Sequence, residues 1–389
     1  MIPVSYNLRN LAVRKSTTAA AALGLALVVF VLSASMMLNR GIQKTLGRSA
    51  SPDVAIVLRK GSEAELSSGI EDASASIVTA SKEIKKTAEG LPLFVNEVVA
   101  VILLEKLGTD GGLSNAQVRG VPDGVLRFRP TVRIVDGRAA QPGSDEVIIG
   151  KAIRGRFRGL DIGQTFELKK NRPVKVVGVF SDEGSSHESE VWCDLHVVRT
   201  AFGREGSVSS LRVRLESASA FDTFKASIES NRQLGLVVTR ETDFLEKQSE
   251  GTRNFITALA VMITLFISIG AMIGATITMH ASVAHRQREI GTLRALGFSR
   301  GTILLSFLLE STFLALLGGV AGATASLGMA FVRPSLMNFS SWSEIVFSFE
   351  PTPQILGTAI LVGGLMGIIG GFMPAIRAAR VSPIEAMRN

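Results

Sequence analysis

The densest group of chemically versatile side chains lies between residues 187 and 196. His187, Cys193 and His196 share this segment with several acidic residues. Zinc sites, however, usually present their ligands as tight pairs, such as two cysteines separated by two to four residues. The competing interpretation is a β-strand over residues 190–195 with side chains alternating between two faces. The segment therefore leaves two hypotheses open, a metal-dependent enzyme and a structural strand, and the spacing favours the strand.

Nucleotide hydrolysis requires a phosphate-binding loop, which in P-loop proteins has two glycines, a lysine and a hydroxyl residue at fixed spacing. Here Gly150-Lys151 is followed by Ala152, and Asp145 stands where the first glycine would be. We therefore expect no catalytic residue and no bound nucleotide or metal on this chain. Any ATP-derived energy must come from another polypeptide.

Glu310 is the ionisable residue that stands out within an apolar run. It lies seven residues into that run, which is about 10 Å along a helix. An ionisable group at such a depth is costly and usually faces protein or water. Two interpretations follow: a proton or cation site, or a protonated or hydrogen-bonded structural group. The position near one end of the run favours the structural interpretation.

Four apolar runs must position these residues, and they lie at 19–38, 255–279, 303–332 and 355–376. Each is long enough to cross the roughly 30 Å hydrocarbon core of a bilayer as a helix. The predicted fold is therefore membrane all-α, with four transmembrane helices. A polar stretch at 40–254 predicts a mixed α/β extracytoplasmic domain between helices 1 and 2. The polar segment 241–253, which lacks proline, is expected to extend the second helix as a stalk.

The distribution of basic residues predicts the orientation. Short segments at 1–18, 280–302 and 377–389 carry more arginine and lysine than acid, whereas the loop 333–354 does not. Short basic segments stay in the cytoplasm, while long domains translocate largely regardless of charge. We therefore expect a multi-pass membrane protein with both termini inside and an outer loop at 333–354. The net charge of +8 reflects this topology, and we expect no nucleic-acid partner.

The first apolar run has a second interpretation as a cleavable signal peptide, because Arg14-Lys15 precede it and Ser33-Ala34-Ser35 lie near its end. Its length exceeds the usual 7–15 residues of a signal-peptide core, which favours a retained helix. Cys193 is the single cysteine, so no internal disulfide is expected.

Short β-rich runs punctuated by glycine and proline recur through the outer domain. They are most frequent in a centre at about 121–214, which predicts a β-rich insertion into an α/β domain.

Glycines spaced by four residues recur in the last three apolar runs. Such spacing lets helix backbones approach closely. The pattern fits packing within one helix bundle and packing between subunits equally well. The residues concerned are Gly270, Gly274, Gly318, Gly322, Gly363, Gly367 and Gly371.

Two cytoplasmic segments carry a recognisable family pattern. Residues 288–297 read REIGTLRALG, and residues 374–388 read PAIRAARVSPIEAMR. Both resemble the MacB/FtsX family of ABC transporter permeases, and residues 118–121 resemble its periplasmic core domain. Residues 255–389 accordingly resemble an FtsX-like permease domain. Ser382, Pro383 and Glu385 also form a capping box that predicts one last short helix.

The resemblance implies a permease that works as a homodimer or heterodimer with two copies of a cytoplasmic ABC ATPase. ATP and Mg²⁺ would bind that ATPase, and we expect it to be a separate chain. The loop helix would dock on the ATPase through Arg288, Glu289, Leu293, Leu296 and Gly297. A periplasmic adaptor and membrane lipid are further partners that the family suggests.

Two classes of function remain after the metal-enzyme hypothesis. The favoured class is a permease in which ATP hydrolysis moves the extracytoplasmic domain to export or extract a substrate, of the efflux or lipoprotein type. The alternative is an FtsX-like signal transducer that regulates a cell-wall hydrolase without transport. The terminal SPIEAMR sequence resembles the MacB branch, which favours transport.

Overall fold

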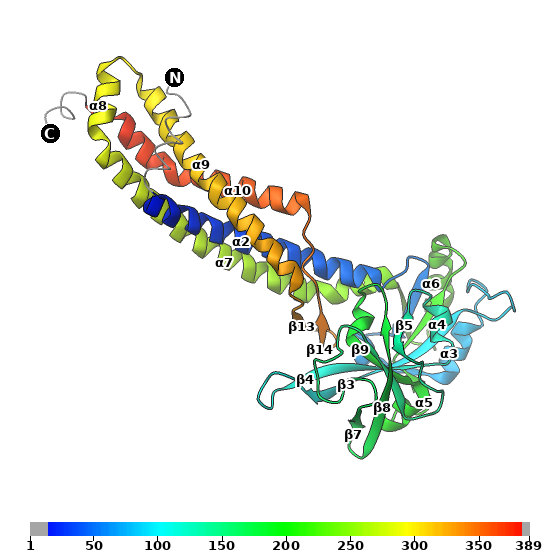
Figure 1. Cartoon of the computed structure of the whole chain (residues 1–389). Helices are drawn as coiled ribbons and strands as arrows, with labels where there is room; N and C mark the ends of the chain where they lie inside the picture. Colours follow the sequence, from blue (N-terminus) through cyan, green and yellow to red (C-terminus); the bar gives the residue numbers. More distant parts are fainter. Residues whose placement is uncertain (1–14, 383–389) are drawn as a thin grey trace. The chain divides into compact units, whose positions relative to one another are not determined.

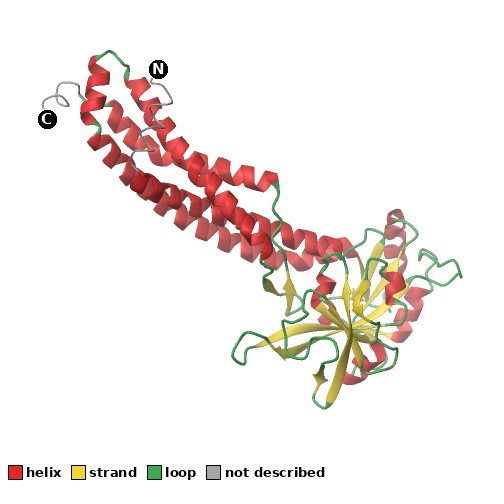
Figure 2. Ribbon diagram, viewed as in Figure 1, coloured by secondary structure: helices red, strands yellow, loops and turns green. Residues whose placement is uncertain are grey.

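A computed structural model describes residues 15–382, which divide into two compact units. The first unit contains the chain up to Arg40 together with Phe255–Val332 and the segment from Phe349 onward. The second contains Gly41–Asn254 and Arg333–Ser348. The first unit is helical and the second contains the strands (Figures 1 and 2). The short helix expected from Ser382 onward lies outside the described residues.

The helical elements are α2 (Lys15–Arg48), α7 (Glu241–His285), α8 (Gln287–Ala295), α9 (Arg300–Ser326), η4 (Leu327–Phe331) and α10 (Pro353–Ala379). Among the described residues, four helices are long and apolar enough to cross a membrane: α2, α7, α9 continued by η4, and α10. Two of them begin with a side-chain cap. The Ser299 hydroxyl accepts a hydrogen bond from the Thr302 N–H, and the Thr352 hydroxyl accepts one from Ile355. Such caps satisfy orphan N–H groups at a helix start.

The helices differ in length from the predicted apolar runs. Helix α7 is one uninterrupted helix that covers the expected stalk as well as 255–279. Helix α2 likewise continues beyond residue 38 to Arg48. In contrast, α9 ends at Ser326, and residues 327–331 form a 3₁₀ helix. Hydropathy therefore located the apolar parts of these helices but not their ends, since α2 and α7 continue through polar residues.

The second unit contains a ten-stranded mixed sheet in the order β12-β1-β11-β3-β4-β9-β6-β8-β5, with β7 paired to β8. The pairs β4–β9 and β6–β8 are parallel, and the other pairs are antiparallel. Its strands are β1 (Val54–Arg59), β3 (Phe94–Glu105), β4 (Leu113–Val121), β5 (Arg133–Gly137), β6 (Glu146–Gly150), β7 (Thr165–Lys169), β8 (Arg172–Ser181), β9 (Glu190–Asp194), β11 (Ser210–Arg214) and β12 (Leu236–Arg240).

Short elements complete this unit. The helices are η1 (Glu65–Ser67), α3 (Asp72–Thr79), α4 (Val125–Phe128), η2 (Ser186–Ser189), α5 (Leu195–Phe202), η3 (Ala218–Ala220) and α6 (Phe221–Glu229). Two small antiparallel pairs also form, β2 (Ile70–Glu71) with β10 (Ser207–Val208) and β13 (Ser335–Asn338) with β14 (Ser343–Val346).

Two features of this unit differ from the sequence expectations. The centre at 121–214 carries strands, but it also carries α5, and the long strands β3 and β4 lie before most of it. Strands from before, within and after the centre share one sheet. Strand pairing between distant segments therefore joins what the sequence suggested was a separate insertion. The predicted outer loop 333–354 contains the β13–β14 hairpin.

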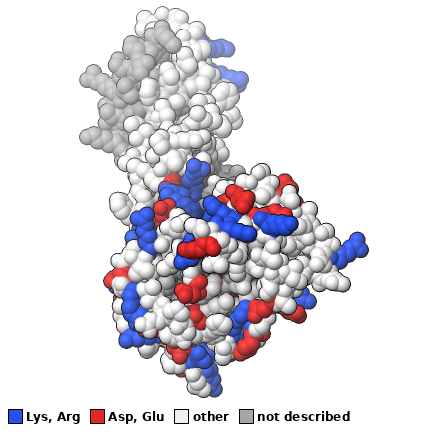
Figure 3. Space-filling model, turned by 90° about the vertical axis from the view of Figure 1, so that its right-hand side faces the viewer, with Lys and Arg blue, Asp and Glu red and all other residues white. Residues whose placement is uncertain are grey.

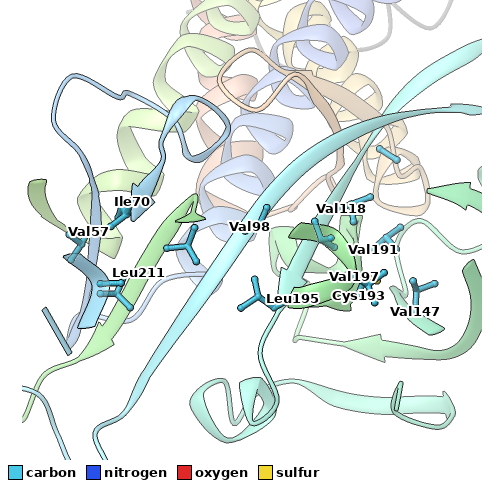
Figure 4. Packing of buried hydrophobic residues seen from close by; sticks show 14 of the residues in the cluster. Val57, Ile70, Val98, Val118, Val147, Val191, Cys193, Leu195, Val197 and Leu211 are labelled. Atoms are coloured by element: carbon cyan, nitrogen blue, oxygen red, sulfur yellow. The ribbon is translucent and has the colours of Figure 1, made fainter. Parts of the chain in front are cut away.

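Alternating apolar residues of the central strands build the core of this unit (Figure 4). Val98, Val118, Val191 and Leu211 come from four neighbouring strands and are fully buried. On the face drawn in Figure 3, basic and acidic side chains are interspersed over the surface of this unit. The opposite side of the same central strands carries buried charged side chains.

Candidate functional site

The short helix α8 ends in a glycine-dependent cap. Gly297 has φ of +92°, a conformation that residues with a Cβ rarely adopt. The Gly297 N–H donates to the Arg294 carbonyl, and the Phe298 N–H donates to the Leu293 carbonyl. This pair of bonds is a Schellman motif, which satisfies carbonyls at a helix end. Gly297 therefore ends the helix, whatever else it contacts.

Helix α8 has an inner and an outer side. Ile290 is buried, and Leu293 packs partly against the same apolar cluster, which contains Val283, Ile303 and Phe307. Arg288 and Glu289 are exposed, and the exposed fraction of Leu296 is 72%. The structure thus separates two leucines that the sequence grouped together: Leu293 faces its own chain, and Leu296 faces outward.

Glu310 pairs with a basic residue that sequence reasoning missed. The Arg286 Nη1 donates to Glu310 Oε2 at 2.8 Å, and both side chains are buried. The guanidinium also lies 5.0 Å from the centre of the Phe307 ring and 3.2 Å from Glu289. Arg286 immediately follows α7 and precedes α8, so it ties the start of α8 to α9. The two residues lie 24 positions apart, with Arg286 in the loop 280–302 and Glu310 within the apolar run that follows it, so nothing in their spacing marks them as a pair.

The spaced glycines fall into two groups. A Cβ added at Gly318 or Gly322 would overlap carbonyl oxygens of α2, those of Ala22 and Ala26. In α10, a Cβ added at Gly363, Gly367 or Gly371 would meet Val29, Ala315 or Ser311 of the same chain. These five glycines therefore serve packing within the chain.

Gly270 and Gly274 form the second group. A Cβ added at either position would have no neighbour within 4 Å among the described residues. Both line an open groove of about 410 Å³ between α2 and α7. In the most apolar stretch of α7, only 6% of the residues are buried. The corresponding share is 33% in α2, 50% in α9 with η4, and 39% in α10. The described part of the chain thus leaves α7 largely uncovered.

The segment around His187 does not gather into a metal site. His187 is buried in η2, where its Nδ1 lies 3.0 Å from Asp182 Oδ2. Cys193 points into the core, and burial, followed by the nearby charge of Asp194, raises its pKa to about 12. His196 lies exposed on α5. Within residues 15–382, no group of three or more potential ligands is placed to hold a metal ion.

A buried ion network lies on the other face of the central strands. Four of its members alternate in charge across four adjacent strands: Arg212 on β11, Glu97 on β3, Arg119 on β4 and Glu190 on β9. Each of its side chains is at most 7% exposed. The seven members of this buried ion network are Glu65, Glu97, Arg119, Arg129, Glu190, Arg212 and Glu241.

The geometry of the network is that of charge-assisted hydrogen bonds. Arg119 lies 2.7 Å from Glu190 and 2.8 Å from Glu97. Arg212 lies 2.7 Å from Glu65 and 2.8 Å from Glu241, and it also contacts Glu97. Sequence reasoning missed this network because its members are scattered from residue 65 to residue 241.

The network makes the stability of this unit dependent on acid pH. Burial raises the pKa of Glu97, but the charges of Arg212, Arg119 and Arg129 outweigh it and lower the pKa to about 2. Arginine charges likewise outweigh burial at Glu65 and Glu190 and lower their pKa values. A carboxyl group whose pKa is depressed in the folded state stabilises that state above its unfolded pKa. This stabilisation is lost as the pH falls toward the folded pKa.

We therefore expect the Tm of this unit to hold above about pH 4.5, near the ordinary pKa of glutamate, and to fall steeply toward pH 2. The measurement is the near-ultraviolet circular dichroism of the full chain, because buried Trp192 packs against Phe180 at a ring distance of 4.4 Å. A Tm that stays level down to pH 2 would contradict the assignment.

The fold and these sites define a class: a membrane protein with an α/β unit inserted between its first and second apolar helices and a short helix in the loop after the second. The family model for the MacB-like periplasmic core domain matches residues 17–231, and the model for the FtsX-like permease C-terminal domain matches residues 261–383. The chain belongs to the MacB/FtsX family of ABC transporter permeases.

Two relatives illustrate the similarity. Over 240 residues the chain is 28% identical to an uncharacterized ABC transporter permease of Methanocaldococcus jannaschii, covering 60% of this chain and 59% of that protein. Over 264 residues it is 31% identical to the macrolide export ATP-binding/permease protein MacB of Rhodospirillum rubrum, covering 65% of this chain and 39% of that protein. The chain thus spans less than two thirds of the length of either relative.

Two solved structures are also similar. The periplasmic region of MacB from Actinobacillus actinomycetemcomitans has a TM-score of 0.38 and 14% identity, covering 52% of this chain and 95% of that one. The extracellular domain of the noncanonic ABC-type transporter YknZ from Gram-positive bacteria has a TM-score of 0.36 and 17% identity, covering 48% and 99%.

Proposed function

We propose that this chain is a permease subunit that couples ATP hydrolysis by a separate cytoplasmic ATPase to movement of its α/β unit. The observation that carries the proposal is the continuity of α7. Its first residue, Glu241, belongs to the buried ion network, and its last, His285, is followed by Arg286 and α8. One helix therefore links the sheet to the loop that carries the family motif.

The proposal includes four spans with both termini inside a bacterial inner membrane. It is supported by the four apolar helices and by the basic character of 280–302 and of the two terminal segments. ATP and Mg²⁺ would bind the partner ATPase, and the chain itself would contribute no catalytic residue.

We assign α8 as the helix that docks on the ATPase, with Leu296 as its apolar contact. Arg288 and Glu289 add charge on the same exposed side, and Gly297 fixes the helix end. Leu293 lies on the inner side of α8 and packs against the apolar cluster that contains Ile303 and Phe307. Exchanging Leu293 for a charged residue would therefore disturb the permease itself, whereas a change at Leu296 tests docking alone.

Leu296→Asp is expected to reduce co-purification of the ATPase, and the ATP hydrolysis of the complex, by at least about tenfold. A residue that acts as the hot spot of an interface contributes about 2 kcal/mol or more, and we assign that role to Leu296. The matched control is Leu107→Asp, the same change at a leucine that is 49% exposed in the other unit. Retention of the ATPase by Leu296→Asp at the level of the control would refute the assignment.

We further propose that a second permease copy packs on the groove that Gly270 and Gly274 line. Small residues at this spacing permit close helix contact, and this pair makes no such contact within the described chain. The second copy would be an identical chain in a homodimer and a related permease chain in a heterodimer.

Gly274→Leu is expected to fill this groove and shift the protein from dimer toward monomer in lipid nanodiscs, as measured by mass photometry. Gly357→Leu is the control, because a Cβ at Gly357 also meets nothing within 4 Å and Gly357 lies outside the groove. A dimer fraction equal to that of the control would argue against this interface.

We propose export or extraction of a hydrophobic compound or a lipoprotein as the substrate class. A relative is named for macrolide export, which supports efflux of a hydrophobic compound; extraction of a lipoprotein uses the same outward movement. A periplasmic adaptor would complete an efflux system. The FtsX-like alternative shares the coupling helix and differs in its output, so release of a cell-wall hydrolase activity without substrate movement would support it instead.

A further inference from the structure

Glu241 is the one member of the buried ion network that lies on a helix leading out of the α/β unit. The other six lie on strands β3, β4, β9 and β11, on η1, and just after α4. Glu241 Oε1 accepts from Arg212 Nε at 2.8 Å and lies 3.8 Å from Arg129 Nη1. Its other oxygen accepts from the Ser51 N–H at 3.1 Å. One carboxylate thus joins the start of α7, strand β11 and the segment that follows α2.

The charge balance of the network sets Glu241 apart. The network contains three arginines and four glutamates. Without Glu241, three arginines face three glutamates, and the remaining buried charges balance. Removing one partner of an isolated buried pair is strongly destabilising because a buried charge is left behind. Here the network carries one excess negative charge, and its charges become balanced when Glu241 leaves, so the departure of Glu241 has a low electrostatic cost.

The released carboxylate would also be favourably placed. Glu241 is the first residue of α7, and Asp243 occupies the same first turn. Carboxylates at a helix N-terminus interact favourably with the helix dipole and the free N–H groups. Release therefore exchanges one stabilised position for another, which is the energetic requirement for two accessible states.

Apolar contacts would keep α7 attached when Glu241 is released. Phe244 and Leu245, in the next turn, are buried against Ile56 and Leu58 of β1. Such contacts are non-directional and tolerate a small shift, whereas a charge-assisted hydrogen bond has a defined geometry. The apolar contacts thus hold the helix near the sheet, and Glu241 fixes where along the sheet it lies.

We propose that Glu241 is a positioning residue that locks α7 against the sheet, and that its release from Arg212 permits the shift of α7 during the ATP-driven cycle. The lock itself is a property of this chain, and the link to ATP rests on the function proposed above.

The test measures a distance within the α/β unit of the full-length chain. Spin labels are attached at Lys60→Cys, just after β1, and at Lys247→Cys on α7, so their separation reports the position of α7 relative to the end of β1. Both residues are exposed and can be labelled, whereas the native Cys193 is buried. Pulsed electron paramagnetic resonance in nanodiscs then gives the distance distribution. We expect one narrow distance in the otherwise unchanged chain.

Glu241→Gln keeps the size of the side chain and removes its charge. We expect a second distance to appear. The ratio of released to locked molecules should rise by about tenfold or more relative to the unchanged chain, because a hydrogen bond to a charged group changes an equilibrium constant by a factor of this order. Glu241→Asp keeps the charge with a shorter reach and should give an intermediate population. Asp243→Asn removes a charge from the same turn at an exposed site and should leave the single distance.

A Glu241→Gln distribution that matches the unchanged chain, or broadening that is equal in Asp243→Asn, would overturn the lock. If Glu241→Gln does not fold, the Glu241→Asp distribution decides in the same way. A second arm uses the labelled chain with its co-purified ATPase, trapped with ATP and vanadate. The expected result is the same second distance; an unchanged distance would refute the role in the cycle. Absence of any bound ATPase would instead count against the proposed function, while the first arm would still decide the lock.

Discussion

Replacing Glu310 with leucine is expected to lower the stability of the permease by about 3–5 kcal/mol, the range found when one partner of a buried ion pair is removed. The substitution takes away the carboxylate that lies 2.8 Å from Arg286. The Arg286 guanidinium then loses this buried carboxylate and keeps its contact with the exposed Glu289. Because Arg286 connects α7 to α8, we also expect ATPase coupling to fall. Thermal inactivation of the detergent-solubilised chain measures the first effect.

A double variant separates the cost of leaving Arg286 without the Glu310 carboxylate from the loss of the pair itself. Exchanging both partners, Arg286→Met with Glu310→Leu, should recover most of the lost stability, since well-packed apolar replacements of a buried pair are often neutral. Glu310→Gln should lie between, because it keeps a hydrogen-bond acceptor for Arg286. If Glu310 carried protons instead, Glu310→Gln would abolish activity with assembly and ATP hydrolysis intact. A Glu310→Leu protein as stable as the parent chain would show that the ion pair is not structural.

The second large effect is expected at Gly322. A single methyl group there, in Gly322→Ala, would overlap the backbone of Ala26 in α2. Backbone atoms cannot rotate away as a side chain can, so α2 and α9 must separate. Overpacking of this kind typically costs about 1–3 kcal/mol. The expected result is a lower temperature of thermal unfolding for the full chain.

Gly357→Ala serves as the matched control, because the added Cβ has no neighbour within 4 Å. It should be neutral or slightly stabilising, since alanine is the better helix former by roughly 1 kcal/mol. Equal behaviour of the two variants would mean that α2 and α9 are not packed as described. A larger loss in Gly322→Ala would confirm that this glycine serves packing within one chain.

Local physical signals account for what the sequence predicted well. Long apolar runs located the four long apolar helices, because length and hydropathy are properties of contiguous residues. The short loop helix that the family resemblance implied is present as α8, and it ends at Gly297 in the observed cap. The family assignment from residues 288–297 and 374–388 is confirmed by the two matching family models.

What the sequence missed depends on contacts between distant residues. Glu65, Glu97 and Arg212 each look like ordinary solvated charges, and only the order of the strands brings them together. Arg286 and Glu310 are likewise brought together only by the fold, since Arg286 lies between α7 and α8 and Glu310 lies within α9. The roles of Gly270 and Gly322 could not be separated by spacing alone, because both occur in the same motif and differ only in what faces them.

The alternation of arginine and glutamate across β11, β3, β4 and β9 also bears on how this sheet assembles. A slip of one residue in any of these strands would turn its charged member toward the apolar core and an apolar residue toward the ions. Exchanging neighbouring strands would place like charges side by side. Both errors carry a high desolvation or repulsion cost, so mispaired intermediates are penalised before packing is complete. The alternating charges thus favour the native strand order over other orders. This matters in a sheet where paired strands, such as β4 and β9, are far apart along the chain.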